Sequence, residues 1–168
     1  DKEVNPPDEQ ELEMIYAILQ MEETAVRDVM VPRPDLVTIE LSQSVSKAVA
    51  LMREAGHSRI LVYEESIDHV VGILHARDLL RLADPAESSV TIQDMLRPAH
   101  FVPEGKRLDD LLREFQRQRA HMAVVVDEYG GTAGLVTLED ILEEIVGEIV
   151  DEFDEEEQEV QIINGDEV

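Results

Sequence analysis

The sequence contains one seven-residue pattern twice, 62 residues apart, at residues 72–78 and 134–140. Each copy begins with a glycine and two apolar residues, has Asp in the seventh place, and leads into a leucine-rich or isoleucine-rich segment. Most other paired positions along the chain differ by 62 or 63 residues, so the pattern belongs to one duplicated unit. A unit of about 60 residues buries only a modest share of its surface alone. We therefore expect the two copies to pack together.

Apolar runs and turn residues predict the same β-α-β-β-α order in both copies. For the first copy we expect strands at residues 36–39, 59–63 and 70–74, a helix that Ser44 caps and Gly56 closes, and a second helix at 75–83. For the second copy we expect strands at 100–102, 122–126 and 133–136, a turn at 127–131, and helices at 108–115 and after Thr137. Short helical lead-ins are expected at 24–30 and 90–96, each followed by proline.

A helix is also expected ahead of the repeat, from Asp8, where acidic residues open it. Its buried side is predicted to consist of Leu12, Ile15, Tyr16 and Leu19. The helix after Thr137 carries an apolar stripe that runs on to Val150.

The composition excludes several classes of protein. The chain has 168 residues, 43% of them hydrophobic, and no cysteine, which excludes disulfides, thiolate metal sites and catalysis by a thiol. No apolar run approaches the roughly 18 residues that a membrane-spanning helix needs. The net charge of −25 argues against a nucleic-acid surface, because binding phosphate backbones needs clustered Lys and Arg. A nucleotide ligand is still allowed, since salt screens surface fields beyond about 8 Å. The acidic C-terminal segment fits a solvated helix end or, alternatively, a sensor of divalent cations.

The start of the last helix carries the side chains with the most suggestive chemistry. Thr137 stands at the predicted N-cap and Asp140 lies three residues on. A helix N-terminus offers unpaired N–H groups to a phosphate, and a carboxylate there can accept hydrogen bonds from the two hydroxyls of a ribose. The same spacing is a helix-capping signature in which both side chains satisfy only backbone donors. A single copy of this pattern would favour the capping interpretation. Its repetition makes nucleotide binding the stronger candidate.

Motifs of enzymes and of metal sites are missing from the sequence. The five histidines form no His-x-x-x-His pair, and adjacent carboxylates on a helix diverge in direction. The sequence has no Gly-x-x-x-x-Gly-Lys-Ser/Thr loop and no Gly-x-Ser-x-Gly elbow. We therefore expect no enzyme activity and no histidine metal site.

Three segments, 27–33 (RDVMVPR), 57–60 (HSRI) and 127–141 (DEYGGTAGLVTLEDI), give the chain a recognisable family resemblance. Over about residues 25–149 it resembles a tandem pair of CBS (cystathionine β-synthase) domains of the magnesium and cobalt efflux (CorC) and hemolysin C-type family. The resemblance implies an α/β (α+β) fold with two packed CBS motifs, an N-terminal helix and an acidic C-terminal helix or tail. The corresponding boundaries are 1–23 for a linker helix, 24–84 and 85–150 for the two motifs, and 151–168 for an acidic linker and the start of a truncated transporter-associated domain.

The family resemblance also implies a ligand and the residues that hold it. Family members bind adenine nucleotides, ATP or AMP, often with Mg²⁺. By this resemblance Thr137 contacts phosphate, Asp140 holds the ribose, Arg59 faces the phosphates, and Ile60 with its neighbours lines the adenine slot. The full set implied for the nucleotide is Val31, Pro32, Ser58, Arg59, Ile60, Leu61, Leu135, Thr137, Glu139 and Asp140. His75 replaces the hydroxyl residue in the first copy, so we expect one nucleotide per chain, at the site around Asp140.

The resemblance further implies a regulatory module on the cytoplasmic side of a divalent-metal (Mg/Co) transporter in the cell membrane. It implies a homodimer formed through the CBS pairs and a membrane domain elsewhere in the full-length protein. Two alternatives stay open: a soluble accessory CBS protein of a separate transporter, and a CBS regulatory insert of an enzyme.

Overall fold

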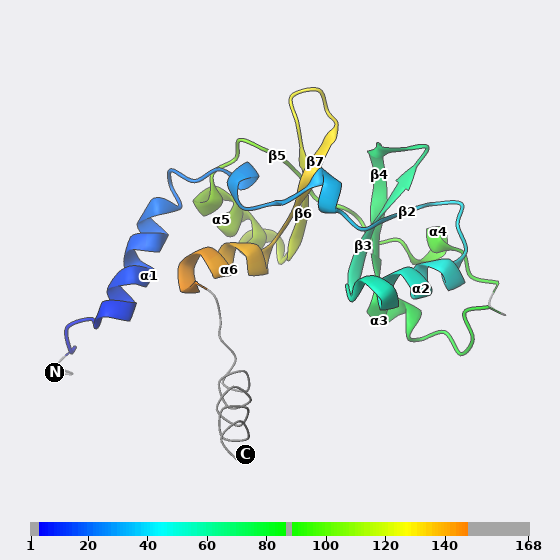
Figure 1. The fold of residues 1–168 in the computed structure, drawn as a ribbon, viewed down its shortest axis with the longest axis horizontal. Helices are drawn as coiled ribbons and strands as arrows, with labels where there is room; N and C mark the ends of the chain where they lie inside the picture. Colours follow the sequence, from blue (N-terminus) through cyan, green and yellow to red (C-terminus); the bar gives the residue numbers. More distant parts are fainter. Residues whose placement is uncertain (1–3, 87–88, 148–168) are drawn as a thin grey trace, which may run out of the picture.

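The structure, a computed structural model, describes residues 4–86 and 89–147 (Figure 1). An N-terminal helix is followed by two units built in the same order. The elements before and within the first unit are α1 (Glu9–Gln20), the 3-10 turn η1 (Val26–Asp28), β1 (Val31–Pro32), the 3-10 turn η2 (Arg33–Asp35), β2 (Thr38–Glu40), α2 (Val45–Ala55), β3 (Arg59–Glu64), β4 (Ser66–His75) and α3 (Ala76–Leu79). The second unit contains α4 (Ile92–Met95), β5 (Phe101–Pro103), α5 (Leu108–Gln118), β6 (Met122–Val126), β7 (Thr132–Thr137) and α6 (Leu138–Val146).

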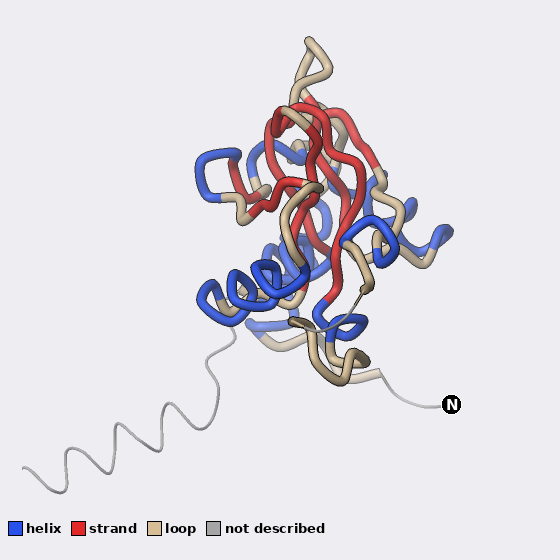
Figure 2. Tube along the Cα trace, turned by 90° about the vertical axis from the view of Figure 1, so that its right-hand side faces the viewer, coloured by secondary structure: helices blue, strands red, loops and turns tan. Residues whose placement is uncertain are grey.

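Each unit folds around its own small sheet. In the first, β2 pairs in parallel with β3 across the α2 connection, and β3 pairs antiparallel with β4 as a hairpin. In the second, β5, β6 and β7 repeat this arrangement with α5 as the connection. A parallel pair needs a crossover of a dozen or more residues, and a helix supplies it in both units. Figure 2 shows the strands gathered at the centre, with helices around them.

The two units exchange their lead-in segments. β1 precedes the first sheet in sequence but pairs antiparallel with β7 of the second, with Val31 opposite Leu135. The segment before β5 makes the reciprocal contact, because Arg97 pairs antiparallel with Ile73 of β4. These pairings tie each unit to the other through backbone hydrogen bonds, as the small size of each unit led us to expect.

The hydrophobic core has a separate part in each unit and a third part between them. The core of the first unit is built from α2, β3 and β4, and that of the second from α5, α6 and the central strands. The third part lies between the sheets, where Leu61, Val70, Ile73 and Val124 are buried and Leu135 packs against them. Leu61 and Ile60 are neighbours on β3 but belong to different clusters, as alternation of side chains along a strand requires.

A polar link joins the units beside the third cluster. Thr132, at the start of β7, is buried; its hydroxyl donates to the Ile67 carbonyl at 2.8 Å and its N–H donates to Asp68 Oδ1 at 3.1 Å. Arg33 forms an ion pair with the same Asp68 and donates to the Thr132 carbonyl at 3.1 Å. The link therefore holds the β4 hairpin against the beginning of β7.

Several predicted elements are confirmed with small shifts of their ends, including the caps of α2. The Ser44 hydroxyl accepts from the Lys47 N–H at 3.1 Å, and Gly56 ends the helix with a left-handed φ of 71°. The predicted helix at 75–83 is wrong in length, because α3 covers only Ala76–Leu79. His75 donates or accepts no capping hydrogen bond there, so this helix lacks the side-chain support that α2 and α6 have.

The predicted buried side of α1 is also wrong. Leu12, Ile15, Tyr16 and Leu19 are all exposed, and the described helix has no fully buried residue. Within the described residues, α1 makes its main contacts with α6, and these contacts leave most of its apolar side chains exposed. The lead-in at 24–30 forms a 3-10 turn and the lead-in at 90–96 a four-residue helix, both shorter than predicted. The apolar positions predicted beyond residue 147, and the segment 151–168, lie outside the described residues.

Among residues 4–86 and 89–147, no helix is both long and apolar enough to cross a membrane.

Candidate functional site

The junction between β7 and α6 places Thr137 and Asp140 together. Thr137 is the N-cap residue, and its hydroxyl accepts from the Asp140 N–H at 3.2 Å. In return Asp140 Oδ2 accepts from the Thr137 N–H at 2.8 Å. Thr137 and Asp140 therefore form the capping box that their spacing predicts. It uses only Oδ2 of the carboxylate, so Oδ1 of the half-buried Asp140 is available to a hydroxyl of a ligand.

β1 forms one wall beside this junction. Val31 lies opposite Leu135 and Pro32 opposite Gly134 in the antiparallel register. A Cβ atom on Gly134 would stand 2.3 Å from the Val31 carbonyl oxygen, so only glycine lets the two backbones approach this closely. The pairing places the predicted residues Val31 and Pro32 opposite positions of β7 that lie two and three residues before Thr137.

The predicted residues of β3 are distributed differently. Leu61 shares the cluster between the sheets with Leu135 and so faces the second unit. Ile60 is buried in the core of the first unit, on the other face of β3. Arg59, half-buried, lies opposite His75, and the Ser58 carbonyl accepts from the Ala76 N–H at 2.8 Å. The structure thus joins Ser58 and Arg59 to the first junction, while their contact with a nucleotide at the second stays a prediction. Glu139 is exposed on the first turn of α6.

The first junction, between β4 and α3, differs in its chemistry. His75 occupies the N-cap position without a side-chain cap. Asp78 is held by Arg97, whose Nε donates to Oδ2 and whose Nη2 donates to Oδ1, both at 2.8 Å. This bidentate pair, followed by the weaker field of the arginine charge, lowers the pKa of Asp78 below its ordinary value. The role of Arg97 was not predicted from the sequence. The available signal was Pro98, which follows the second lead-in segment as Pro32 follows the first, and so places Arg97 at the position of Val31.

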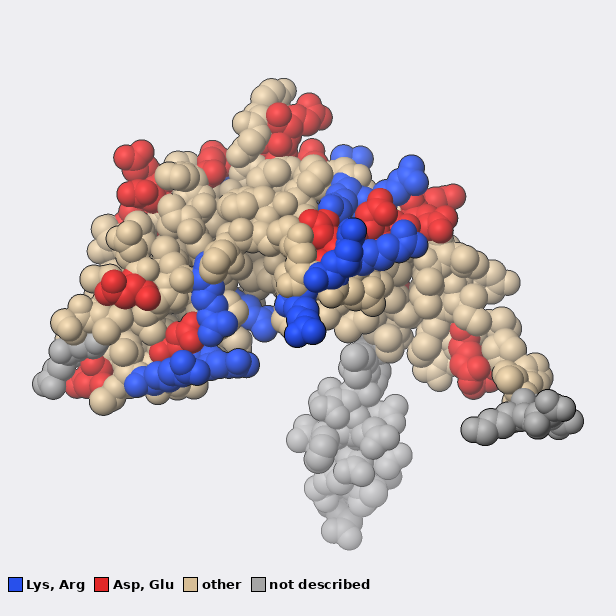
Figure 3. All heavy atoms as spheres, turned by 180° about the vertical axis from the view of Figure 1, so that it is seen from behind, with Lys and Arg blue, Asp and Glu red and all other residues tan. Residues whose placement is uncertain are grey.

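His75 lies in a positively charged environment. Partial burial lowers its pKa first, and the charges of Arg97 and Arg59 lower it further, against the opposing effect of Asp78. At neutral pH the imidazole is therefore neutral. Figure 3 shows that Lys and Arg side chains gather on both sides of a notch in the molecule despite the acidic composition.

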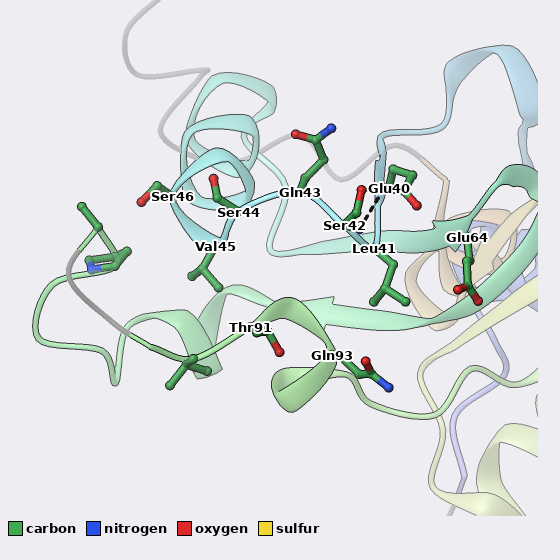
Figure 4. Close-up of a pocket in the computed structure, with 13 residues that line it drawn as sticks. Glu40, Leu41, Ser42, Gln43, Ser44, Val45, Ser46, Glu64, Thr91 and Gln93 are labelled. Carbon is green, nitrogen blue, oxygen red and sulfur yellow. Dashed lines mark hydrogen bonds between the residues drawn. The ribbon is translucent and has the colours of Figure 1, made fainter.

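An open hollow of about 540 Å³ lies elsewhere on the first unit (Figure 4). Its lining includes Ser42, Ser44, Thr91 and the carboxylates of Glu40 and Glu64. The Ser42 hydroxyl donates to Glu40 and is the main cause of its lowered pKa, and the Ser42 N–H, which donates at 2.8 Å, lowers this pKa further. Two carboxylates and no Lys or Arg in the lining make this hollow unsuitable for an anionic ligand. The sequence pattern gave no signal for it.

The described residues bring together no group of three or more His, Asp or Glu side chains that could hold a metal ion.

Comparison with known proteins gives consistent matches over both units. Residues 26–84 and 89–147 each match the model of the CBS domain. A magnesium and cobalt efflux protein CorC from Vibrio cholerae is 51% identical over 159 residues, which cover 94% of this chain and 55% of the relative. The chain therefore spans about half the length of the curated relatives that it matches.

Two solved structures extend the comparison. The CBS domain of the bacterial CNNM/CorC family Mg²⁺ transporter in complex with ATP is 50% identical, with a TM-score of 0.79, over 83% of this chain and 99% of that chain. A CBS-domain pair with bound AMP from Klebsiella pneumoniae is 37% identical, with a TM-score of 0.63, over 74% of this chain and 99% of that chain.

Proposed function

Since the chain belongs to the CBS-domain family and carries the domain twice in tandem, we propose that it is an adenine-nucleotide-binding regulatory module of a divalent-metal transporter or efflux protein. Similar proteins are named as magnesium and cobalt efflux proteins, and similar structures hold ATP or AMP. In this proposal the nucleotide binds together with Mg²⁺, and the module regulates a membrane domain in the full-length protein rather than catalysing a reaction.

The observation that carries the proposal is the arrangement at the β7–α6 junction. The Thr137 hydroxyl sits at a helix start, where N–H groups favour a phosphate, and Asp140 has one oxygen outside the cap for the ribose. Val31 and Leu135, paired across β1 and β7, supply apolar surface beside it for the adenine. One junction therefore combines an anion-binding end, a hydroxyl acceptor and an apolar wall.

A magnesium ion would act here as part of the ligand. The chain has 39 acidic residues against 14 Lys and Arg, so a bare triphosphate meets an unfavourable overall field. Mg²⁺ bound to the phosphates reduces that repulsion, which gives nucleotide binding a dependence on the metal.

Regulation follows if the nucleotide binds two arrangements of the module with different affinity. The module would form a homodimer, and the bound nucleotide would favour one arrangement of it. A ligand shifts such an equilibrium only by its difference in affinity between the states, and typical couplings are about 1–3 kcal/mol. α6 starts at the proposed site and packs against α1, so both helices are placed to transmit the change.

Calorimetry with ATP and Mg²⁺ tests the proposal through Asp140→Ala. Loss of hydrogen bonds to a charged group costs about 1.5–3 kcal/mol, so affinity should fall about tenfold or more. Asp78→Ala should leave affinity nearly unchanged, because that carboxylate already binds Arg97. Titrations with ADP, AMP and ATP, with and without Mg²⁺, identify the working ligand.

The matched control is Asp94→Ala. Thr91 and Asp94 form the same capping box at the start of α4, with the Thr91 N–H donating to Asp94 at 2.9 Å. This variant removes an equivalent cap away from the proposed site, so it should lower stability without changing nucleotide affinity. Equal affinity of the wild type and Asp140→Ala for MgATP would remove Asp140 from the site and with it the assignment of the site to the β7–α6 junction.

A further inference from the structure

The crossed lead-in segments give the two junctions matching positions. Val31 pairs with Leu135 at the second junction, and Arg97 pairs with Ile73 at the first. Leu135 and Ile73 are 62 residues apart, the same offset as Asp140 and Asp78. Arg97 is therefore the counterpart of Val31, and each pairs with the strand that leads into the junction of the other unit.

The backbone contacts support this correspondence independently of the sequence offset. A Cβ atom on Gly134 would stand 2.3 Å from the Val31 carbonyl oxygen, and a Cβ on Gly72 would stand 2.8 Å from the Arg97 carbonyl oxygen. Both lead-ins are thus pressed against a glycine two residues before the end of an apolar run. Because the registers agree, the side chains of Val31 and Arg97 start from equivalent places.

The two side chains have opposite consequences for the neighbouring aspartate. A valine cannot hydrogen-bond, and Asp140 keeps one oxygen outside its cap. Arg97 reaches Asp78 with two N–H donors and engages both carboxylate oxygens at 2.8 Å. The Asp78 side chain is only 16% exposed in this pair, so the guanidinium also covers it from solvent.

From this geometry we propose that Arg97 closes the first junction to nucleotide by occupying the carboxylate that a ribose would need. The inference rests on the proposed function, since it takes the β7–α6 junction as the open site. Arg97 is then the residue that sets the number of nucleotides per chain. His75 adds to the closure, because it supplies no hydroxyl and no cap at the start of α3.

The experiment reopens the first junction in a chain whose second junction is disabled. Calorimetry with MgATP would compare wild type, Asp140→Ala, and Asp140→Ala combined with Arg97→Val and His75→Thr. We expect one nucleotide per wild-type chain, an affinity at least tenfold lower in Asp140→Ala, and recovery of saturable binding in the triple variant. In a chain with Asp140 intact, Arg97→Val with His75→Thr should raise the stoichiometry from one to two.

The control replaces another arginine. Arg117 is exposed on α5, so Arg117→Val makes the same change of charge and should leave the stoichiometry at one. Circular dichroism and thermal unfolding would establish that each variant is folded. A folded triple variant that binds no better than Asp140→Ala would overturn the role of Arg97.

A measurement on the wild type avoids any dependence on folding of the variants. In NMR experiments with saturating MgATP, direct contacts of the nucleotide should be seen with residues 134–140 and not with residues 72–78. Direct nucleotide contacts at 72–78, or two nucleotides per wild-type chain, would overturn this inference while leaving the proposed function standing. A wild type that binds no nucleotide at either junction would overturn the proposed function itself.

Discussion

The two units share one architecture and differ most at the junction where the last strand of each enters a helix. In the second unit Thr137 and Asp140 form a capping box and α6 runs for nine residues. In the first, His75 caps nothing, Asp78 pairs with Arg97 and α3 stops after four residues. Duplication has preserved the sheet, the glycine contacts and the crossed lead-ins. The two copies differ in the side chains that would contact a ligand.

Matching positions of the two copies can have different roles. An aspartate present in both copies serves a cap in one and an ion pair in the other. The partner that decides between these roles comes from the other unit, because the lead-in segments cross. A site in such a pair is therefore a property of both units together.

The largest expected difference concerns the two glycine contacts. In Gly134→Ala the new methyl group would meet backbone at 2.3 Å, so β1 must move, and we expect a loss of about 3 kcal/mol in stability. Gly72→Ala has more room, at 2.8 Å, and should cost about 1–2 kcal/mol. Urea unfolding measures both values, and MgATP affinity should fall only for Gly134→Ala.

Gly105→Ala is the control for this pair, since no atom outside its immediate neighbours lies within 4 Å of the position where its Cβ would be. It should change stability by less than about 0.5 kcal/mol. Equal costs for Gly72→Ala and Gly134→Ala would mean that the two lead-ins are packed alike, and the contrast between the junctions would then rest on side chains alone.

A smaller effect is expected from exchanging the residues at the two caps. Thr137→Val removes the hydroxyl that accepts from the Asp140 N–H and should cost about 1 kcal/mol of stability, together with affinity for the nucleotide. His75→Thr supplies a hydroxyl where none caps α3, and should regain part of that amount. Thermal unfolding of both variants measures the difference. A loss of stability in His75→Thr would show that the imidazole supports the first junction in some other way.

The sequence predicted the repeat, the order of elements and the α/β fold, and the matches to CBS domains and CBS-pair structures confirm these predictions. The prediction succeeded because apolar runs such as 122–126 are long, bounded by turn residues and local in their signal. It failed where burial depends on distant neighbours: the apolar stripe of α1 looks buried in sequence, yet in the described part of the chain its main partner is α6 and the stripe is exposed.

Only the local part of the candidate site could be predicted from the sequence. Thr137 and Asp140 are three residues apart, so their joint position follows from helix geometry alone. The pairing of Val31 with Leu135, and of Arg97 with Asp78, depends on the crossing of the lead-ins between units. No periodicity within either segment encodes that crossing. The assignment of the residues at 58–61 to the nucleotide stays a prediction that the described contacts do not test.

The smallest expected effect is the pH dependence introduced by Arg97. The pKa of Asp78 is lowered in the folded chain, chiefly by the hydrogen bonds from Arg97, so its contribution to stability is present in full above the unfolded pKa of about 3.9. This contribution is lost as the pH falls through the lowered folded pKa. Because the arginine is 44% exposed, solvent screens the pair, and its contribution at neutral pH should be small.

Arg97→Val should accordingly be less stable than wild type at pH 7 and equally stable in strong acid, with Arg117→Val unchanged at both. NMR titration should show the pKa of Asp78 rising in Arg97→Val. The pKa of His75 should rise too, because Arg97 is one of the charges that lower it. Burial, the largest cause of the lowering, is still present in this variant. For His75 the lowered pKa makes folding less favourable as the pH falls below the unfolded value of about 6.5 towards the lowered folded pKa, and it has no effect on stability above that range. An Asp78 pKa that is the same in wild type and Arg97→Val would mean that the two side chains do not pair in solution, and the first junction would then differ from the second only through His75.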